Sequence, residues 1–115
     1  MTHKMNLTPA AFGAVSTGKK TVEMRLFDEK RAALSIGDEI EFENTDTHQT
    51  IMCRVVSLTR YNDFYELYWH CDKVAIGYGK DETANAEDMY NYYSPEQIKK
   101  NGVLAIEIEL IRTST

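Results

Sequence analysis

Hydrophobic and polar residues alternate between positions 21 and 27 of the 115-residue chain. Side chains of a strand point to opposite faces in turn, so this segment predicts a strand with one apolar and one charged face. The apolar face holds Val22, Met24 and Leu26, and the polar face holds Thr21, Glu23 and Arg25. Such a charged face is typical either of a solvated strand or of a binding site.

The same alternation predicts four more strands. A short one covers residues 4–7, and a second over 38–44 turns Ile40 and Phe42 inward. A polar turn over 44–49 joins that strand to its hairpin partner over 50–59. The strongest strand is the last, over 103–112. Its predicted inward residues are Leu104, Ile106, Ile108 and Leu110, and its outward ones are Glu107 and Glu109.

Capping residues predict the helices between these strands. Thr8 and Pro9 begin a helix that Gly18 ends, Asp28 begins a short helix through Leu34, and Asn62 is the expected cap of a helix up to Trp69. Residues 86–93 and 94–101 are also expected to be helical, the latter with a capping box of Ser94 and Gln97. The glycine-containing segment 73–84 is expected to be a loop, and its position makes it a candidate lid.

These elements predict a single α+β domain over residues 1–115: a small mixed β-barrel with flanking helices. The chain contains no linker, no repeat and no apolar run as long as a membrane span, and its first residues lack a secretory signal. We therefore expect a soluble cytoplasmic protein that does not interact with membranes. The sequence does not indicate the oligomeric state.

The charge distribution indicates a local site rather than a long nucleic-acid track. The net charge is −5, yet residues 1–35 hold six Lys or Arg against three Asp or Glu. A long track would need a broadly positive surface. Histidines and cysteines show no zinc spacing, so we expect no metal and no cofactor; Cys53 and Cys71 are expected to be free thiols.

The charged segment also has a recognisable spacing. Gly18, Lys20, Glu23 and Arg25 resemble the Gly-x-Lys-x-x-Glu-x-Arg signature of the ASCH family, whose members have a PUA-like β-barrel. Further segments resemble the family in the same order. They are Leu26 with Asp28, Lys30 and Arg31; Gly37-Asp38 leading into Ile40 and Phe42; Tyr92-Tyr93-Ser94; and Gly102-Val103-Leu104-Ala105-Ile106. The resemblance implies a PUA-like fold over nearly the whole chain.

Our first functional hypothesis is the binding of RNA or a modified nucleoside in a cleft that the signature lines. Lys20 and Arg25 supply cationic donors, and Glu23 supplies an acceptor for an exocyclic amine such as that of cytosine. The resemblance implies the same ligand class. Tyr93 and Tyr61 are candidate stacking partners for a base, although aromatic residues at helical spacing are more often part of a core.

An enzyme is the alternative hypothesis. The resemblance implies that small bacterial members deacetylate N4-acetylcytidine with a lysine in the signature, a threonine three residues later and a distant glutamate. Lys20 matches the lysine, but Glu23 occupies the threonine position. A carboxylate there is a candidate general base on water, with Lys20 or Arg25 stabilising the oxyanion. No residue of the chain can be assigned to the distant glutamate.

A protein-interaction module is the third hypothesis. The acidic surface and the tyrosine-rich region 61–93 are features of protein interfaces as well. Exposure of Tyr90, Tyr92 and Tyr93 distinguishes the hypotheses, because a flat exposed cluster favours a partner protein. A concave cluster beside Lys20 favours a ligand.

Overall fold

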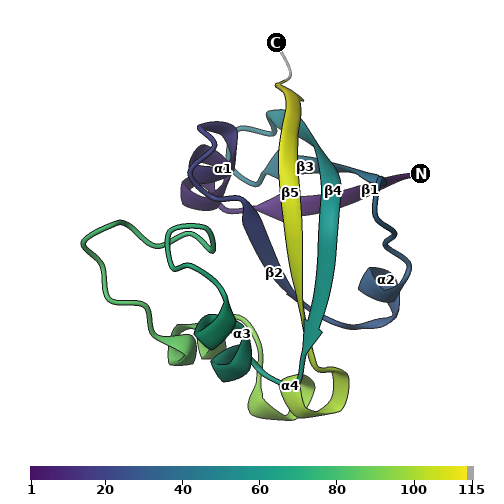
Figure 1. Cartoon of the computed structure of the whole chain (residues 1–115). Helices are drawn as coiled ribbons and strands as arrows, with labels where there is room; N and C mark the ends of the chain where they lie inside the picture. Colours follow the sequence, from purple (N-terminus) through teal and green to yellow (C-terminus); the bar gives the residue numbers. More distant parts are fainter. Residues whose placement is uncertain (114–115) are drawn as a thin grey trace.

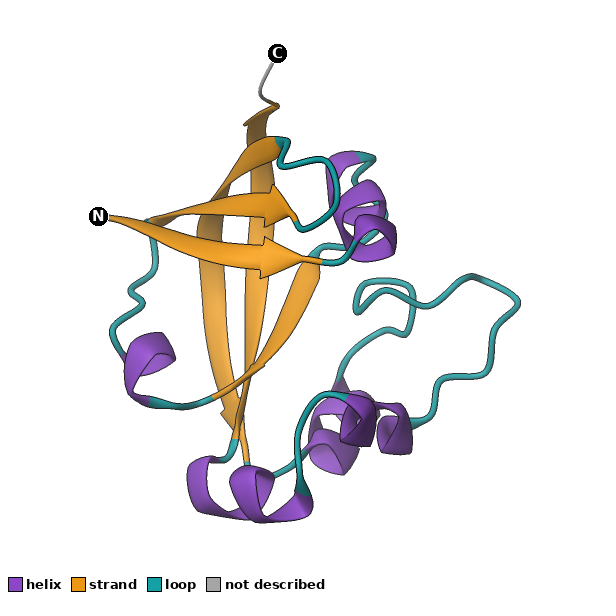
Figure 2. Ribbon diagram, turned by 180° about the vertical axis from the view of Figure 1, so that it is seen from behind, coloured by secondary structure: helices purple, strands orange, loops and turns teal. Residues whose placement is uncertain are grey.

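Five strands form one curved sheet in the order β1-β3-β4-β5-β2 in the computed structural model, which describes residues 1–113 (Figure 1). Strands β1 and β3 are parallel, and the other neighbouring pairs are antiparallel. Figure 2 shows β1 and β3 crossing over the long strands, which curls the sheet into a half-barrel. The strands are β1 (Thr2–Leu7), β2 (Val22–Leu26), β3 (Glu39–Asn44), β4 (Thr50–Tyr61) and β5 (Val103–Thr113).

Short helices flank this half-barrel, as the sequence predicts. Thr8, Asp28 and Ser94 cap their helices, and Ser94 forms the predicted capping box with Gln97. The cap expected at Asn62 is wrong by one residue: Asp63 accepts the hydrogen bond from Glu66 N, because an extended Asp63 places its carboxylate at the first turn. The helices are α1 (Pro9–Ser16), α2 (Glu29–Ala32), α3 (Phe64–His70), the 3-10 helix η1 (Ala86–Asn91) and α4 (Pro95–Asn101).

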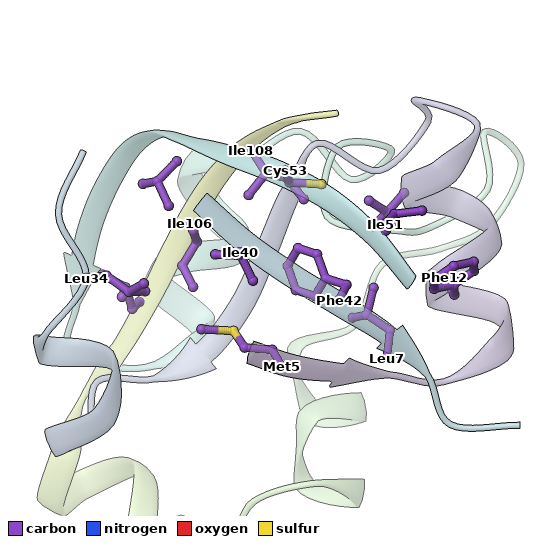
Figure 3. Close-up of a cluster of buried hydrophobic side chains, with 13 residues drawn as sticks. Met5, Leu7, Phe12, Leu34, Ile40, Phe42, Ile51, Cys53, Ile106 and Ile108 are labelled. Carbon is purple, nitrogen blue, oxygen red and sulfur yellow. The ribbon is translucent and has the colours of Figure 1, made fainter. Parts of the chain in front are cut away.

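The sheet buries apolar side chains on both faces. One cluster fills the inside of the half-barrel, where Ile40 and Phe42 are fully buried as predicted (Figure 3). A second cluster lies between the other face of β2 and β5 and the helices α3, η1 and α4. It includes Met24, Leu26, Phe64, Leu67, Ile76, Met89, Ile98, Val103 and Ala105. The first part of strand β5, residues 103–106, is therefore covered on both sides.

One inward prediction for β5 is wrong. Leu104, Ile106 and Ile108 are buried inside the half-barrel, but Leu110 is 36% exposed. Leu110 lies beside a register shift in the β4–β5 ladder. Cys53 pairs with Leu110 but the adjacent Met52 pairs with Arg112, so β5 has one extra residue at this point. Such bulges increase the local twist and turn side chains away from their expected face.

Candidate functional site

Three charged side chains of the signature form one buried cluster. Lys20 Nζ lies 2.8 Å from Glu23 Oε1, and Arg25 contacts Glu23 Oε2 through Nη2 at 2.7 Å and Nε at 2.9 Å. Met24 N donates to Glu23 Oε1 at 3.2 Å. Glu23 is 4% exposed and Lys20 9% exposed. The structure thus excludes a solvated strand face for these residues.

The electrostatics of the cluster hold Glu23 as a carboxylate. Burial alone raises the pKa of Glu23, but the charges and hydrogen bonds of Lys20 and Arg25 outweigh it and lower the pKa below the usual 4.5. Both carboxylate oxygens already accept hydrogen bonds from within the chain. The carboxylate is therefore a weak base and a strong positioning group for the two cations.

Arg25 also connects the two edges of the half-barrel. Its Nη2 donates to the backbone oxygen of Asn6 in β1 at 2.7 Å, while Arg25 itself belongs to β2. Strands β1 and β2 are the two edges of the sheet and have no ladder between them. The charged cluster consequently lies at the seam where the half-barrel remains open.

The local chain path explains how Lys20 reaches this seam. Gly18 adopts φ 79° after α1, a conformation that suits glycine, and Lys20 N donates to Ala14 O at 3.0 Å. Ala75 O then accepts hydrogen bonds from both Thr21 N and Val22 N at 2.9 Å. The loop after α3 is thereby attached to the start of β2, directly beside Lys20.

Gly77 in that loop packs against the lysine. A Cβ at position 77 would lie 3.3 Å from Lys20 Cδ, and Gly77 adopts φ 117°. Only glycine combines this backbone conformation with so close an approach. The loop therefore encloses the aliphatic part of Lys20 while the ammonium reaches Glu23.

A cavity of about 510 Å³ opens above the cluster. This volume is within the range of about 300–1,000 Å³ that is usual for small-molecule sites. Its walls come from three places: the end of β1 with α1, strand β2, and the segment from α3 to the residues after η1. The lining residues include Asn6, Ala11, Ala14, Lys20, Glu23, Arg25, Tyr68, Gly77, Tyr78, Glu82, Asp88, Met89, Tyr92 and Tyr93.

The cavity is also lined by a hydrogen-bonded chain of two tyrosines and an aspartate. Tyr68 Oη lies 2.9 Å from Tyr78 Oη, and Tyr78 Oη donates to Asp88 Oδ2 at 2.7 Å. Burial raises the pKa of both tyrosines, so both keep their protons at neutral pH. Sequence reasoning identified the loop over 73–84 but missed this chain, because its members come from three separate segments.

The predicted site residues fall into two groups. Tyr93 lines the cavity together with Lys20, Glu23 and Arg25, and Phe64 stacks against its ring at 5.9 Å between centroids. Burial raises the pKa of Tyr93. Tyr61 does not line this cavity: its ring stacks on His70 at 5.4 Å, because it ends β4 and packs on the second apolar cluster.

The tyrosines after α3 do not form one flat cluster. Tyr92 and Tyr93 line the cavity that contains Lys20, whereas Tyr90 lines a separate hollow. Because Tyr92 and Tyr93 line a concave surface together with Lys20, they favour a ligand over a partner protein.

The described residues offer neither a metal site nor a membrane-spanning helix. Residues 1–113 contain no group of three or more His, Cys, Asp or Glu side chains arranged to hold a metal ion. Among the same residues, none of the helices has the length and apolar character that a membrane crossing needs. Cys53 and Cys71 are both free thiols, and burial raises the pKa of Cys53 to about 11.

The half-barrel with its charged seam matches a known family. The ASCH domain model covers residues 5–112. The chain belongs to the ASCH domain family. A PUA-like fold agrees with this ASCH membership and with the mixed architecture of the structure. No curated protein matches this ASCH chain.

Solved structures resemble this ASCH domain over almost its whole length. Hypothetical protein PH0355 is 30% identical with a TM-score of 0.82, and the match covers 96% of this chain and 100% of that chain. Protein PF0455 from Pyrococcus furiosus is 31% identical with a TM-score of 0.69, covering 96% and 98%. ASCH from Zymomonas mobilis is 18% identical with a TM-score of 0.64, covering 97% and 71%, and supports the fold alone.

Proposed function

We propose that this ASCH domain binds RNA or a modified nucleoside by holding one base in the cavity at the seam. The observation that carries the proposal is the buried Lys20–Glu23–Arg25 cluster, which presents two oriented cations in a cavity of about 510 Å³ beside the ring of Tyr93. A carboxylate that orients two cations is a costly arrangement to bury without a ligand.

The free donors of the cluster suit the carbonyl and ring-nitrogen acceptors of a base. An ammonium has three N–H groups and a guanidinium has five. Among residues 1–113, Lys20 Nζ has one acceptor, Glu23, and Arg25 uses its Nε and Nη2 groups on Glu23 and Asn6. The remaining N–H groups of Lys20 and the Nη1 group of Arg25 are available to a ligand.

The tyrosine chain supplies the complementary acceptor. Asp88 lines the cavity, and its Oδ2 accepts from Tyr78, which fixes the carboxylate. A base with an exocyclic amine, such as cytosine, has donors for Asp88 and acceptors for Lys20 and Arg25. Tyr93, covered by Phe64 on one side, offers its ring to the base.

Hydrolysis of an N4-acylated cytidine is the second candidate function. The favouring observation is that Lys20 and Asp88 line the same cavity, so one cation and one carboxylate are available for an oxyanion and a water. Water would add its hydroxyl to the acyl carbon and its proton to N4, releasing acetate and cytidine. Glu23 is a poor general base for this step, because its oxygens are occupied and its pKa is lowered.

An amide NMR titration with cytidine, N4-acetylcytidine and a short single-stranded RNA tests both candidates. Binding predicts shifts over residues 18–25 and 76–93, and free acetate in the same tube indicates hydrolysis. Lys20→Met keeps the stem that packs on Gly77 and should weaken binding by about tenfold or more, the effect of losing one charged hydrogen bond. Lys19→Met is the matched control at an exposed neighbour and should bind normally.

If none of the three ligands shifts these amides while Lys20→Met remains folded, the seam does not hold a base and the proposal is wrong. Binding without acetate release rejects the hydrolase alone.

A further inference from the structure

A second hollow of about 420 Å³ lies at the end of the sheet beside α4. Three cations line it: Arg60 from β4, and Lys99 and Lys100 from the last turn of α4. Two tyrosines, Tyr65 and Tyr90, line it as well. None of the proposed seam residues belongs to this hollow.

The cations of the hollow are not neutralised by ion pairs. In the described part of the chain, no carboxylate forms an ion pair with Arg60, Lys99 or Lys100, although the net charge of the chain is −5. Asp63 also lines the hollow, but its carboxylate caps α3. The helix dipole favours the two lysines at the end of α4 and does not account for Arg60.

Arg60 is exposed, but its guanidinium packs on an aromatic ring. Its guanidinium lies 4.4 Å from the centroid of the Phe27 ring, and a Cβ at Gly102 would lie 3.5 Å from Arg60 Nε. A guanidinium held over an aromatic ring keeps its edge available for a planar or anionic group. The hollow thus has one oriented cation and two on a helix end.

The two tyrosines present exposed rings beside these cations. Tyr65 is 51% and Tyr90 45% exposed, and the Tyr65 hydroxyl donates to Glu87 Oε1 at 3.5 Å. Exposed aromatic faces next to cations are the combination that binds single-stranded nucleic acid, since a base stacks on a ring while the phosphate contacts the cations.

The second hollow adjoins the first through one short segment. Tyr90 lines the second hollow, while Met89, Asn91 and Tyr92 line the cavity at the seam. The Cα atoms of residues 90 and 92 are at most about 8 Å apart, because consecutive Cα atoms are about 3.8 Å apart. The two hollows therefore share the segment 89–92, and a polynucleotide that occupies both would cross η1.

We propose that the second hollow binds the nucleotide next to the one held at the seam, so that the ligand of this domain is a single-stranded polynucleotide rather than a free nucleoside. Its base lies against Tyr65 and Tyr90, and its phosphates contact Arg60, Lys99 and Lys100. This inference rests on the proposed function of the seam cavity. An acidic protein segment would match the cations but would leave the exposed rings and the adjoining base cavity unused.

The test compares cytidine with a fluorescein-labelled single-stranded hexacytidine RNA over a range of salt concentrations. The RNA should bind at least about tenfold more tightly than cytidine, since base stacking contributes about 1–3 kcal/mol per base. In Lys99→Gln/Lys100→Gln, the salt slope of RNA binding should fall by about 1.4, at about 0.7 per cation for single strands. Cytidine affinity should not change.

Matched variants separate charge and ring effects. Lys4→Gln/Lys30→Gln removes the same charge from exposed positions outside both hollows and should leave RNA binding nearly unchanged. Tyr90→Phe keeps the ring and should retain binding, whereas Tyr90→Ala should lose severalfold in RNA affinity. A hexaglutamate peptide serves as an acidic polymer without bases.

Each failure has its own meaning. If cytidine binds but the RNA binds no more tightly, or if both lysine pairs change the salt slope equally, the second hollow is not a nucleotide site. If hexaglutamate competes as well as the RNA, the occupant is an acidic protein segment and the inference is wrong. If neither cytidine nor RNA binds, the proposed function itself fails.

Discussion

The wall of the seam cavity that β2 forms and the wall formed by residues 71–93 are built in different ways. Strand β2 is paired with β5 from Val22 to Leu26, and its Glu23 binds two cations at once. The other wall contains no strand and is held by turns, by Ala75 O and by the Tyr68–Tyr78–Asp88 chain. Figure 1 shows this wall as a long loop beside β2.

The β2 wall therefore holds charged groups rigidly, whereas the wall of residues 71–93 offers polar groups that can adjust. Ladder hydrogen bonds on β2 and two buried ion pairs fix the donors before a ligand arrives, which lowers the cost of binding. The loop wall has no ladder and is held by backbone turns, by Ala75 O and by the Tyr68–Tyr78–Asp88 chain, so we expect it to be the part that adapts to a ligand. Four predictions test this contrast.

Glu23→Gln should have the largest effect. It leaves Lys20 and Arg25 buried without their carboxylate, and breaking a buried ion pair in this way costs about 3–5 kcal/mol. Urea denaturation at pH 7 measures the loss in the free energy of unfolding. Glu29→Gln, at an exposed position of α2, is the control and should change stability by less than about 0.5 kcal/mol. Equal stabilities of the two variants would contradict a fixed β2 wall.

Acid should have the second-largest effect, because it weakens the ion pairs of Glu23 in the β2 wall. The folded pKa of Glu23 lies below its usual 4.5, so its ion pairs contribute fully above the unfolded pKa and are lost as the pH falls through the folded pKa. The free energy of unfolding should therefore decline below about pH 4.5, and less steeply in Glu23→Gln. Asp38, whose pKa is lowered first by its hydrogen bond with His3, keeps part of the decline in that variant.

Gly77→Ala tests the junction of the two walls. A non-glycine residue at φ 117° costs about 1–3 kcal/mol, and the new Cβ would lie 3.3 Å from Lys20 Cδ. Both the thermal midpoint and the affinity for cytidine should fall. Gly13→Ala in α1 has no atom within 4 Å of its Cβ and should be neutral or stabilising. A stable Gly77→Ala with full affinity would show that the loop does not position the lysine.

Tyr78→Phe should have the smallest effect and act on the loop wall alone. It removes the hydroxyl that joins Tyr68 to Asp88, which costs about 1 kcal/mol of stability and should lower ligand affinity severalfold. Tyr65→Phe removes a hydroxyl at an exposed position outside this cavity and should change neither the stability nor the affinity for cytidine. If amide shifts in Tyr78→Phe extended into β2, the two walls would not be independent.

The strands and caps could be predicted because they depend on neighbouring residues. Ile40 and Phe42 follow the period of a strand, and Ser94 with Gln97 follows the spacing of a helix start. The cap at Asp63 was missed by one residue, since adjacent Asn62 offers the same chemistry. The exposure of Leu110 depends on a bulge that only the pairing of β4 with β5 reveals.

The β2 wall of the site was also visible in the sequence, because three of its residues are within six positions of one another. The burial of Glu23 was not visible: alternation separates two faces, and only the structure shows that Lys20 and Arg25 cover the carboxylate on the polar face of β2. The tyrosine chain could not be foreseen, because Tyr68, Tyr78 and Asp88 meet only through the path of the loop. The prediction of Tyr61 rests on its residue type alone, and its ring packs on His70 instead.

The contact from Arg25 to Asn6 O has a consequence for the solubility of the molecule. An open half-barrel leaves β1 and β2 as edges, and free edges are templates on which strands of other chains assemble into aggregates. Here the half-buried guanidinium of Arg25 bridges the edges at Asn6 O, and a second chain that paired at this point would have to displace it from Asn6 and Glu23. The residues that position the cations in the cavity therefore also hinder strand pairing between the sheet edges of two molecules.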